Sequence, residues 1–158
     1  MRLIAALAAV AVLSGAWIAF RPARGTSRAP APAPLSPRRK ADVDAMRERA
    51  RRLVADRGAR PENLSEAISL LEECREILKP MAGRSPEAYV AASESLQEAE
   101  RLREALLADL WVDYQRRAHL RDNKGAQAAL RQVLRVVPDR ADPRNERARR
   151  ELSRWMSD

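Results

Sequence analysis

The 158-residue chain has one cysteine, one histidine and five glycines, and only 4% of its residues are aromatic. With Cys74 alone, no intramolecular disulfide can form, and with His119 alone, no multi-histidine metal site is available. No glycine-rich phosphate-binding loop and no nucleophile elbow occur in the sequence. We therefore expect neither an enzyme nor a bound cofactor or metal. Cys74 lies on an apolar helical stripe, which predicts a buried, unreactive thiol.

Alanine, leucine, arginine and glutamate dominate the composition, and these residues lose little entropy in a helix. No segment alternates between apolar and polar residues in the manner of a strand. Apolar stripes at helical spacing predict an all-α domain over residues 41–158. Its five expected helices cover residues of about 41–57, 62–78, 86–121, 125–137 and 143–156.

The third of these segments is long enough for two different uses of its apolar stripe. The stripe consists of Tyr89, Ala92, Leu96, Ala99, Leu102, Leu106, Leu110, Tyr114 and Ala118. It can pack within the domain, or it can form a coiled-coil seam between copies of the chain, which would make the protein a homo-oligomer.

The net charge of +8 belongs mainly to the N-terminal segment. Residues 1–40 contain seven basic residues and no acid, whereas residues 41–158 contain 23 basic and 22 acidic residues. The arginines of the last helix are interrupted by Glu146 and Glu151, and few aromatics are present for stacking, so we expect no nucleic-acid partner. Within the helical part, residues 61–113 carry a net charge of −7 and residues 114–158 a net charge of +6.

The N-terminus contains an apolar run from Leu3 to Phe20, which would rise about 27 Å as a helix and nearly span a bilayer. Residues 1–20 are therefore either a retained membrane anchor through residues 3–20, which we favour, or a signal sequence cleaved near Ala16. Residues 13–16 resemble a bacterial lipoprotein signal, but Ala16 stands where cysteine would be required, which excludes lipidation there.

These features predict a single-pass protein of the bacterial inner membrane with a periplasmic helical domain, or a secreted periplasmic protein if cleavage occurs. The basic residues that follow the run, Arg21, Arg24 and Arg28, favour the opposite, cytoplasmic orientation. The short cationic start and the apolar core are typical of an export signal, and we expect export on that basis.

Residues 21–40 form a linker rich in proline, alanine and arginine. Alternating Ala-Pro pairs cannot form a helix and favour polyproline II, so the 17 residues of the segment 21–37 would reach roughly 50 Å. We expect a semi-rigid spacer that holds the helical domain away from the membrane.

Residues 107–140 resemble one tetratricopeptide repeat, a helix–turn–helix unit. The second helix of the unit and its flanks carry the resemblance through Asp122 in the turn, Ala126, Leu130, Leu134 and Pro138. The first helix departs from the pattern, with Asp113, Tyr114 and Arg117 where the family has leucine, glycine and tyrosine. A second, less complete match covers residues 62–80, through Ala67, Leu71, Cys74 and Pro80, and Ala148 fits a capping helix.

The resemblance implies stacked helical hairpins with a grooved surface that binds a protein or peptide. The candidate partner-binding residues are Tyr114, Arg117 and Arg121, with ordinary packing or solvated roles as the alternative for each. The expected function is a membrane-tethered scaffold or adaptor of the bacterial cell envelope. The alternatives are a self-associating coiled-coil spacer and a basic nucleic-acid-binding protein.

Overall fold

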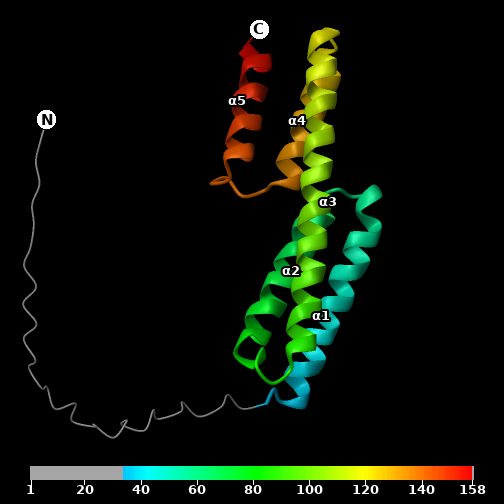
Figure 1. Ribbon diagram of the computed structural model, residues 1–158. Helices are drawn as coiled ribbons and strands as arrows, with labels where there is room; N and C mark the ends of the chain where they lie inside the picture. Colours follow the sequence, from blue (N-terminus) through cyan, green and yellow to red (C-terminus); the bar gives the residue numbers. More distant parts are fainter. Residues whose placement is uncertain (1–33, 158) are drawn as a thin grey trace, which may run out of the picture. The chain divides into compact units, whose positions relative to one another are not determined.

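The structure, a computed structural model, describes residues 34–157 of the chain. These residues form five α-helices and no β-strand (Figure 1). The helices are α1 (Pro37–Ala55), α2 (Asn63–Leu78), α3 (Pro86–His119), α4 (Asn123–Val136) and α5 (Pro143–Ser157), with short 3₁₀ turns η1 (Asp56–Gly58) and η2 (Lys79–Met81). The prediction of an all-α domain is confirmed for this part of the chain.

The expected anchor or signal at residues 1–20 and the linker residues 21–33 lie outside the described residues. From residue 34 to residue 157, no helix combines the length and the apolar character that crossing a bilayer requires.

Helix α1 begins at Pro37, four residues before the expected start, within the segment assigned to the linker. The side chain of Ser36 accepts a hydrogen bond of 3.3 Å from the backbone N–H of Arg39, and Pro37 occupies the first helical position. A serine cap followed by proline is a strong start for a helix, since proline has no N–H to leave unsatisfied.

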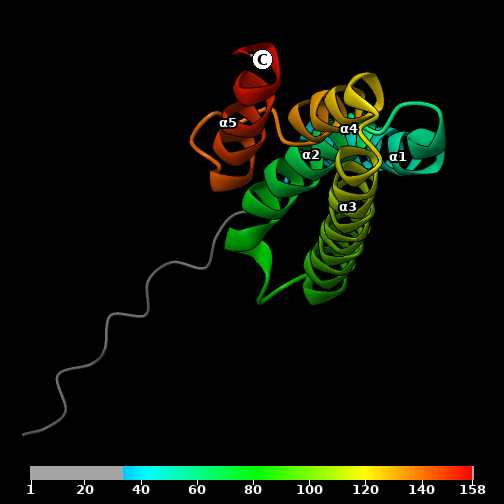
Figure 2. The same cartoon turned by 90° about the horizontal axis from the view of Figure 1, so that it is seen from above.

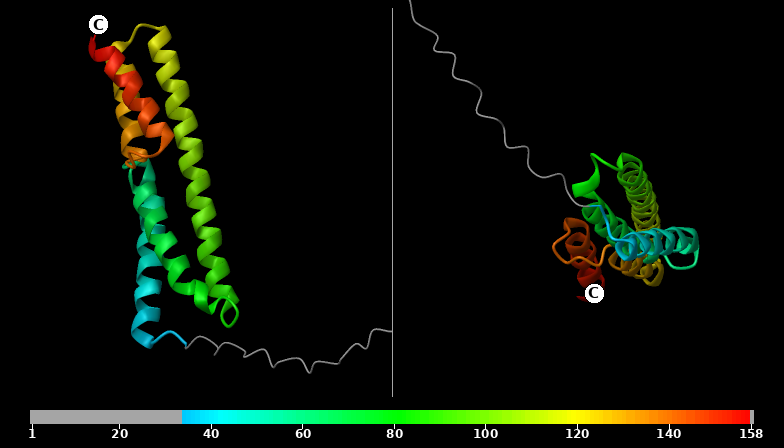
Figure 3. Two further views of the ribbon diagram at one scale, coloured as in Figure 1. Left: turned by 90° about the vertical axis from the view of Figure 1, so that its left-hand side faces the viewer. Right: turned by 90° about the horizontal axis from the view of Figure 1, so that it is seen from below.

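Helix α3 runs unbroken for 34 residues, as predicted, and would extend about 51 Å at helical rise. Helices α1 and α2 lie along its N-terminal half, and α4 and α5 lie along its C-terminal half (Figure 3). Seen from above, α1 and α5 flank α3 at a distance from each other (Figure 2). Helices α2 and α4 meet where the Ser65 hydroxyl donates a hydrogen bond to the Val136 carbonyl.

Three buried apolar clusters succeed one another along α3. Ala92 belongs to a cluster with Val43, Cys74 and Leu78, while Leu96 and Ala99 pack with Ala50, Ala67, Ile68 and Leu71. Leu107 and Leu110 pack with Leu130, Val133, Val136, Val137 and Ala148. Each cluster combines residues of α3 with residues of the helices beside it, so α3 is common to the whole described core.

The buried stripe of α3 differs from the expected one in the middle of the helix. It passes through Leu107, which is 2% exposed, while Leu102 and Leu106 are only half-buried beside it. The residue that continues the stripe between Ala99 and Leu107 is Arg103, four positions from each. The predicted stripe includes Leu102 and Leu106 because it is built from apolar residues only. Helical spacing nevertheless places Arg103 on the packed side of α3.

Arg103 has a buried guanidinium atom without a hydrogen-bond partner. Its Nε atom is shielded from solvent, and the nearest carboxylate oxygen, of Glu104, is 3.7 Å away, too far for a hydrogen bond. A buried donor left unpaired costs about 1–3 kcal/mol. The rest of the side chain is an apolar stem that fits the stripe.

We therefore expect Arg103→Met to leave the free energy of unfolding unchanged or to raise it by about 1 kcal/mol, because methionine keeps the stem and removes the unpaired donor. Urea denaturation followed by circular dichroism measures the change. A loss of more than about 1 kcal/mol would mean that the guanidinium makes a contact that stabilises the fold.

Leu130, fully buried in the third cluster, should be among the most sensitive positions. We expect Leu130→Ala to lower the free energy of unfolding by about 3 kcal/mol, because it removes buried methyl groups and leaves a cavity. Leu120→Ala is the matched control, since Leu120 is 68% exposed, and should cost less than about 0.5 kcal/mol. Equal effects of the two substitutions in urea denaturation would contradict the assigned core.

Candidate functional site

Tyr114 lies half-buried between α3 and α5, where it takes part in the packing of the two helices. Its hydroxyl donates a hydrogen bond of 3.0 Å to the Glu151 carboxylate and accepts one of 3.5 Å from the indole N–H of Trp155. Its ring meets Trp111 edge to face at 5.7 Å, and the Arg147 guanidinium lies 4.3 Å from the centre of a Trp111 ring. The polar group of Tyr114 is thus already bonded within the chain.

Arg117 connects the end of α3 to the beginning of α4. Its guanidinium donates to Asp113 at 2.7 Å and to Asp122 at 3.0 Å, and Asp122 caps α4 by accepting from the backbone N–H of Gly125 at 2.9 Å. The Gly125 N–H and the Arg117 guanidinium lower the pKa of Asp122. A Cβ atom at Gly125 would stand 2.0 Å from an Asp122 carboxylate oxygen, so glycine is what fits beside this cap.

Arg121 differs from the other two candidates because its side chain makes no hydrogen bond or ion pair within the described residues. It is exposed and has a φ of 57°, the left-handed conformation that commonly ends a helix. The structure does not gather the three candidates around one cavity. Their role in partner binding stays a prediction.

Most positions that were expected to pack between repeats are buried. Ala67, Leu71, Ala126, Leu130 and Ala148 are each less than 5% exposed, and Leu134 is half-buried against the third cluster. Pro138 is exposed, just after the end of α4. Burial of this kind is required by any packed helical arrangement and is not specific to one family.

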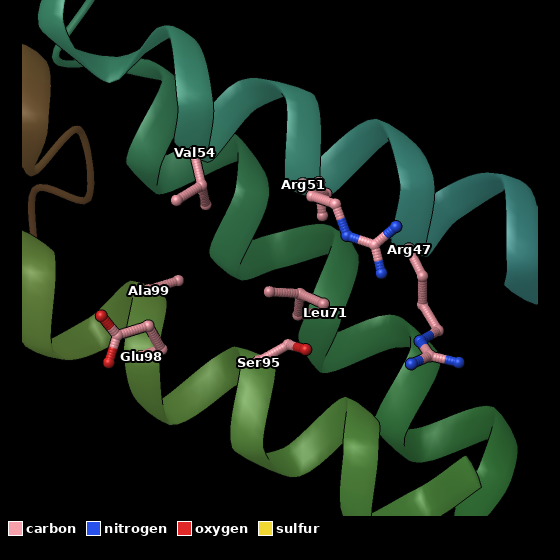
Figure 4. A pocket seen from close by; sticks show the side chains of 8 residues that line it. Arg47, Arg51, Val54, Leu71, Ser95, Glu98 and Ala99 are labelled. Atoms are coloured by element: carbon pink, nitrogen blue, oxygen red, sulfur yellow. The ribbon is translucent and has the colours of Figure 1, made fainter.

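A groove between α1 and α3 is a concave feature that sequence reasoning missed. It contains a hollow of about 180 Å³ whose floor includes Leu71 of α2 (Figure 4). The residues that line the hollow are Arg47, Ala50, Arg51 and Val54 of α1, Leu71 of α2, and Ser95, Glu98 and Ala99 of α3. Figure 4 shows the α1 arginines on one side of the opening and Ser95 and Glu98 on the other.

The groove offers an apolar floor with charged edges. Arg51 pairs with Glu48 at 2.9 Å and Glu98 with Arg101 at 2.9 Å, both on the surface. Arg47, in contrast, forms no ion pair among the described residues. Such a surface can hold apolar side chains and one or more anionic groups, but it has no convergent set of polar groups for catalysis.

The thiol of Cys74 lies in the core of the described chain. Cys74 is fully buried, and burial raises the pKa of its thiol, which keeps it protonated near neutral pH. The predicted burial of this thiol is confirmed. Between residues 34 and 157, no three histidine, cysteine or acidic side chains are placed to hold a metal ion together.

We expect the stabilising effect of Asp122 to depend on pH. Because its pKa is lower in the folded state than the usual value of 3.8, its contribution is complete above that value and is lost as pH falls through the folded-state pKa. Asp122→Ala should therefore lower the melting temperature clearly at pH 7 and much less near pH 2.5. Thermal unfolding at both pH values measures this.

Asp109→Ala is the control for this prediction, because Asp109 is an exposed carboxylate without a hydrogen bond or ion pair in the described part of the chain. Its replacement should change the melting temperature little at either pH. A loss for Asp122→Ala that is as large at pH 2.5 as at pH 7 would contradict an ionic cap.

The comparisons with known proteins leave the chain without an assigned family. No protein-family model, no curated protein and no solved structure matches it. The resemblance to the tetratricopeptide repeat accordingly rests on the residues of this sequence alone.

Proposed function

We propose that the protein is a helical scaffold that binds a protein or peptide partner in the groove between α1 and α3. The observation that carries this proposal is the hollow over Leu71, with an apolar floor and the unpaired cation Arg47 at its edge. An open hollow with an apolar floor beside an unpaired charge favours a partner that supplies both contacts at once.

A macromolecular partner suits this groove better than a small molecule. The hollow is partly open to solvent, and the groups around it are spread over three helices. Small-molecule sites enclose most of their ligand and place several polar groups toward one point. Grooves between helices, in contrast, commonly take a peptide or a helix.

The alternative of a coiled-coil spacer has less support. It requires the apolar stripe of α3 to face a second chain, yet Ala92, Leu96 and Leu110 of that stripe are buried against other helices of the same chain. Exposing them would remove the core that joins α3 to its neighbours. The scaffold proposal uses α3 as it is packed here.

The tether and the location belong to the proposal as well. Residues 3–20 are sufficiently apolar for an anchor, and the Ala-Pro segment would hold the groove away from the bilayer. We propose a bacterial inner-membrane protein with the helical domain in the periplasm, built on degenerate tetratricopeptide-like hairpins. An Ala-Pro segment suits a spacer, since polyproline II is extended and semi-rigid.

Site-specific photocrosslinking in cells tests the partner-binding groove. A photoreactive amino acid replaces Ser95, at the edge of the hollow, in the full-length chain, and a second version carries it at Arg149 on α5. We expect an adduct with a distinct protein from position 95 and not from position 149. Addition of Arg47→Glu should reduce that adduct several-fold, because it reverses the unpaired charge.

Arg149→Glu is the matched control, since it makes the same charge change on an exposed part of α5. It should leave the adduct at position 95 intact. Adducts only between copies of the chain would favour the self-associating alternative, and the absence of any adduct at position 95 would contradict the groove as a binding site.

A further inference from the structure

We infer that the partner segment held by the α1–α3 groove is an amphipathic α-helix with apolar side chains at positions i and i+7 and a carboxylate midway between them. This inference rests on the proposed function of the groove and specifies what it binds.

The groove contains two hollows rather than one. The second is also about 180 Å³ and is lined mainly by apolar residues, with Val43, Leu78, Met81 and Ala88 among them. Arg47 lines both hollows, so they are neighbours along the same groove. A partner that fills the groove therefore has two places for apolar side chains.

The distance between the two hollows follows from the helices around them. On α1 the lining residues of the two hollows repeat at a step of seven, as with Val43 and Ala50, and on α2 Leu78 and Leu71 are also seven positions apart. On α3 the step from Ala88 ranges from seven, to Ser95, to eleven, to Ala99. Seven residues are two turns of a helix, or about 10.5 Å. Because α1 and α2 agree, the two hollows repeat at about that spacing along these two helices.

This spacing selects an α-helix over a β-strand. In a helix, residues i and i+7 lie on the same face about 10.5 Å apart. In a strand, side chains on one face recur every 6.6 Å or so, which places them at roughly 6.6 and 13 Å but not at 10.5 Å. The strand residue at about 10 Å, i+3, points to the opposite face.

Arg47 supplies the charge requirement. It stands where the two hollows meet, and its guanidinium has no carboxylate partner in the described chain, unlike Arg51, which pairs with Glu48. On a bound helix, the residues that face the point midway between i and i+7 are i+3 and i+4. An aspartate or glutamate there would complete a charge-assisted hydrogen bond with Arg47.

Arg47 also argues against a second copy of the chain that would place its own α1 in the groove. Val43 and Ala50, the apolar pair that the α1 of a second copy would have to bring to the groove in a symmetric dimer, are buried in their own chain at 3% and 1% exposure. The residue between them is Arg47 in both copies, which would bring like charges together. A different protein with an acid at that position avoids the repulsion.

Selection from a displayed library tests the inference directly. Random peptides of about 16 residues, long enough to span both hollows as a helix, are selected on the full-length chain and counter-selected on its Ser95→Trp variant, which fills one hollow. We expect groove-dependent peptides to share apolar residues at i and i+7 and an acid at i+3 or i+4. Their circular dichroism should become helical on binding.

Affinity measurements on one selected peptide then test the carboxylate. Replacing its acid by the corresponding amide should weaken binding about fivefold, and Arg47→Glu in the protein about tenfold or more. Arg149→Glu should leave the affinity unchanged. Because the amide substitution is made in the peptide, its effect is independent of the folding of any protein variant.

The outcomes separate this inference from the proposed function. Groove-dependent peptides with apolar residues at every second position, or with basic residues in the middle, would contradict the inferred acidic helix. They would still support the proposal that the groove binds a peptide. No groove-dependent peptide, together with no adduct at position 95 in cells, would overturn both.

Discussion

The unbroken course of α3 is the constraint on which the rest of the described fold depends. Its 34 residues provide one side of all three buried clusters, from Ala92 near one end to Leu110 toward the other. Helix α2 packs on its first half and α4 on its second, while α1 and α5 pack mainly on α2 and α4 and reach α3 through the shared clusters. A break in α3 would therefore divide the core rather than shorten a helix.

Alanine at the helix contacts explains how the groove arises. Ala50, Ala67 and Ala99 are each at most 1% exposed and pack in one cluster. Small residues at such contacts let helices approach closely and contribute little bulk above the contact. Helices α1 and α3 both pack onto α2 in this way. The hollow above Leu71 remains between them because no larger side chain fills it.

The fold could be predicted from the sequence wherever the information is local. The all-α class, the five helices and the length of α3 follow from apolar spacing and from proline and cap residues. The start of α1 was equally local, in Ser36 and Pro37, but the Pro-rich linker obscured it. Arg103 could not be placed in the core from the sequence, because a stripe defined by apolar residues leaves out a charged residue that lies on the packed side.

The candidate site was harder to predict because it depends on contacts between distant segments. The bond from Arg117 to Asp113 spans one helical turn and is visible in the sequence, whereas the bond from Tyr114 to Glu151 joins residues 37 positions apart. The groove requires α1 and α3 to be placed on α2, which no single stripe reveals. The seven-residue steps on α1 and α2 were present in the sequence, but only the placement of the two helices in space relates these steps to one groove.

Charge in this protein is better suited to selecting a partner than to holding the fold together. Most ion pairs in residues 34–157 join side chains on the same helix, and those between helices, such as Arg144 with Glu104, are few. Exposed pairs of this kind contribute little to stability. Apolar burial along α3 stabilises the fold. A cation such as Arg47 is therefore not needed for an ion pair within the described chain and can pair with a partner. An acidic helix in the α1–α3 groove would use that cation, and its apolar residues would cover the floor that the alanines leave open.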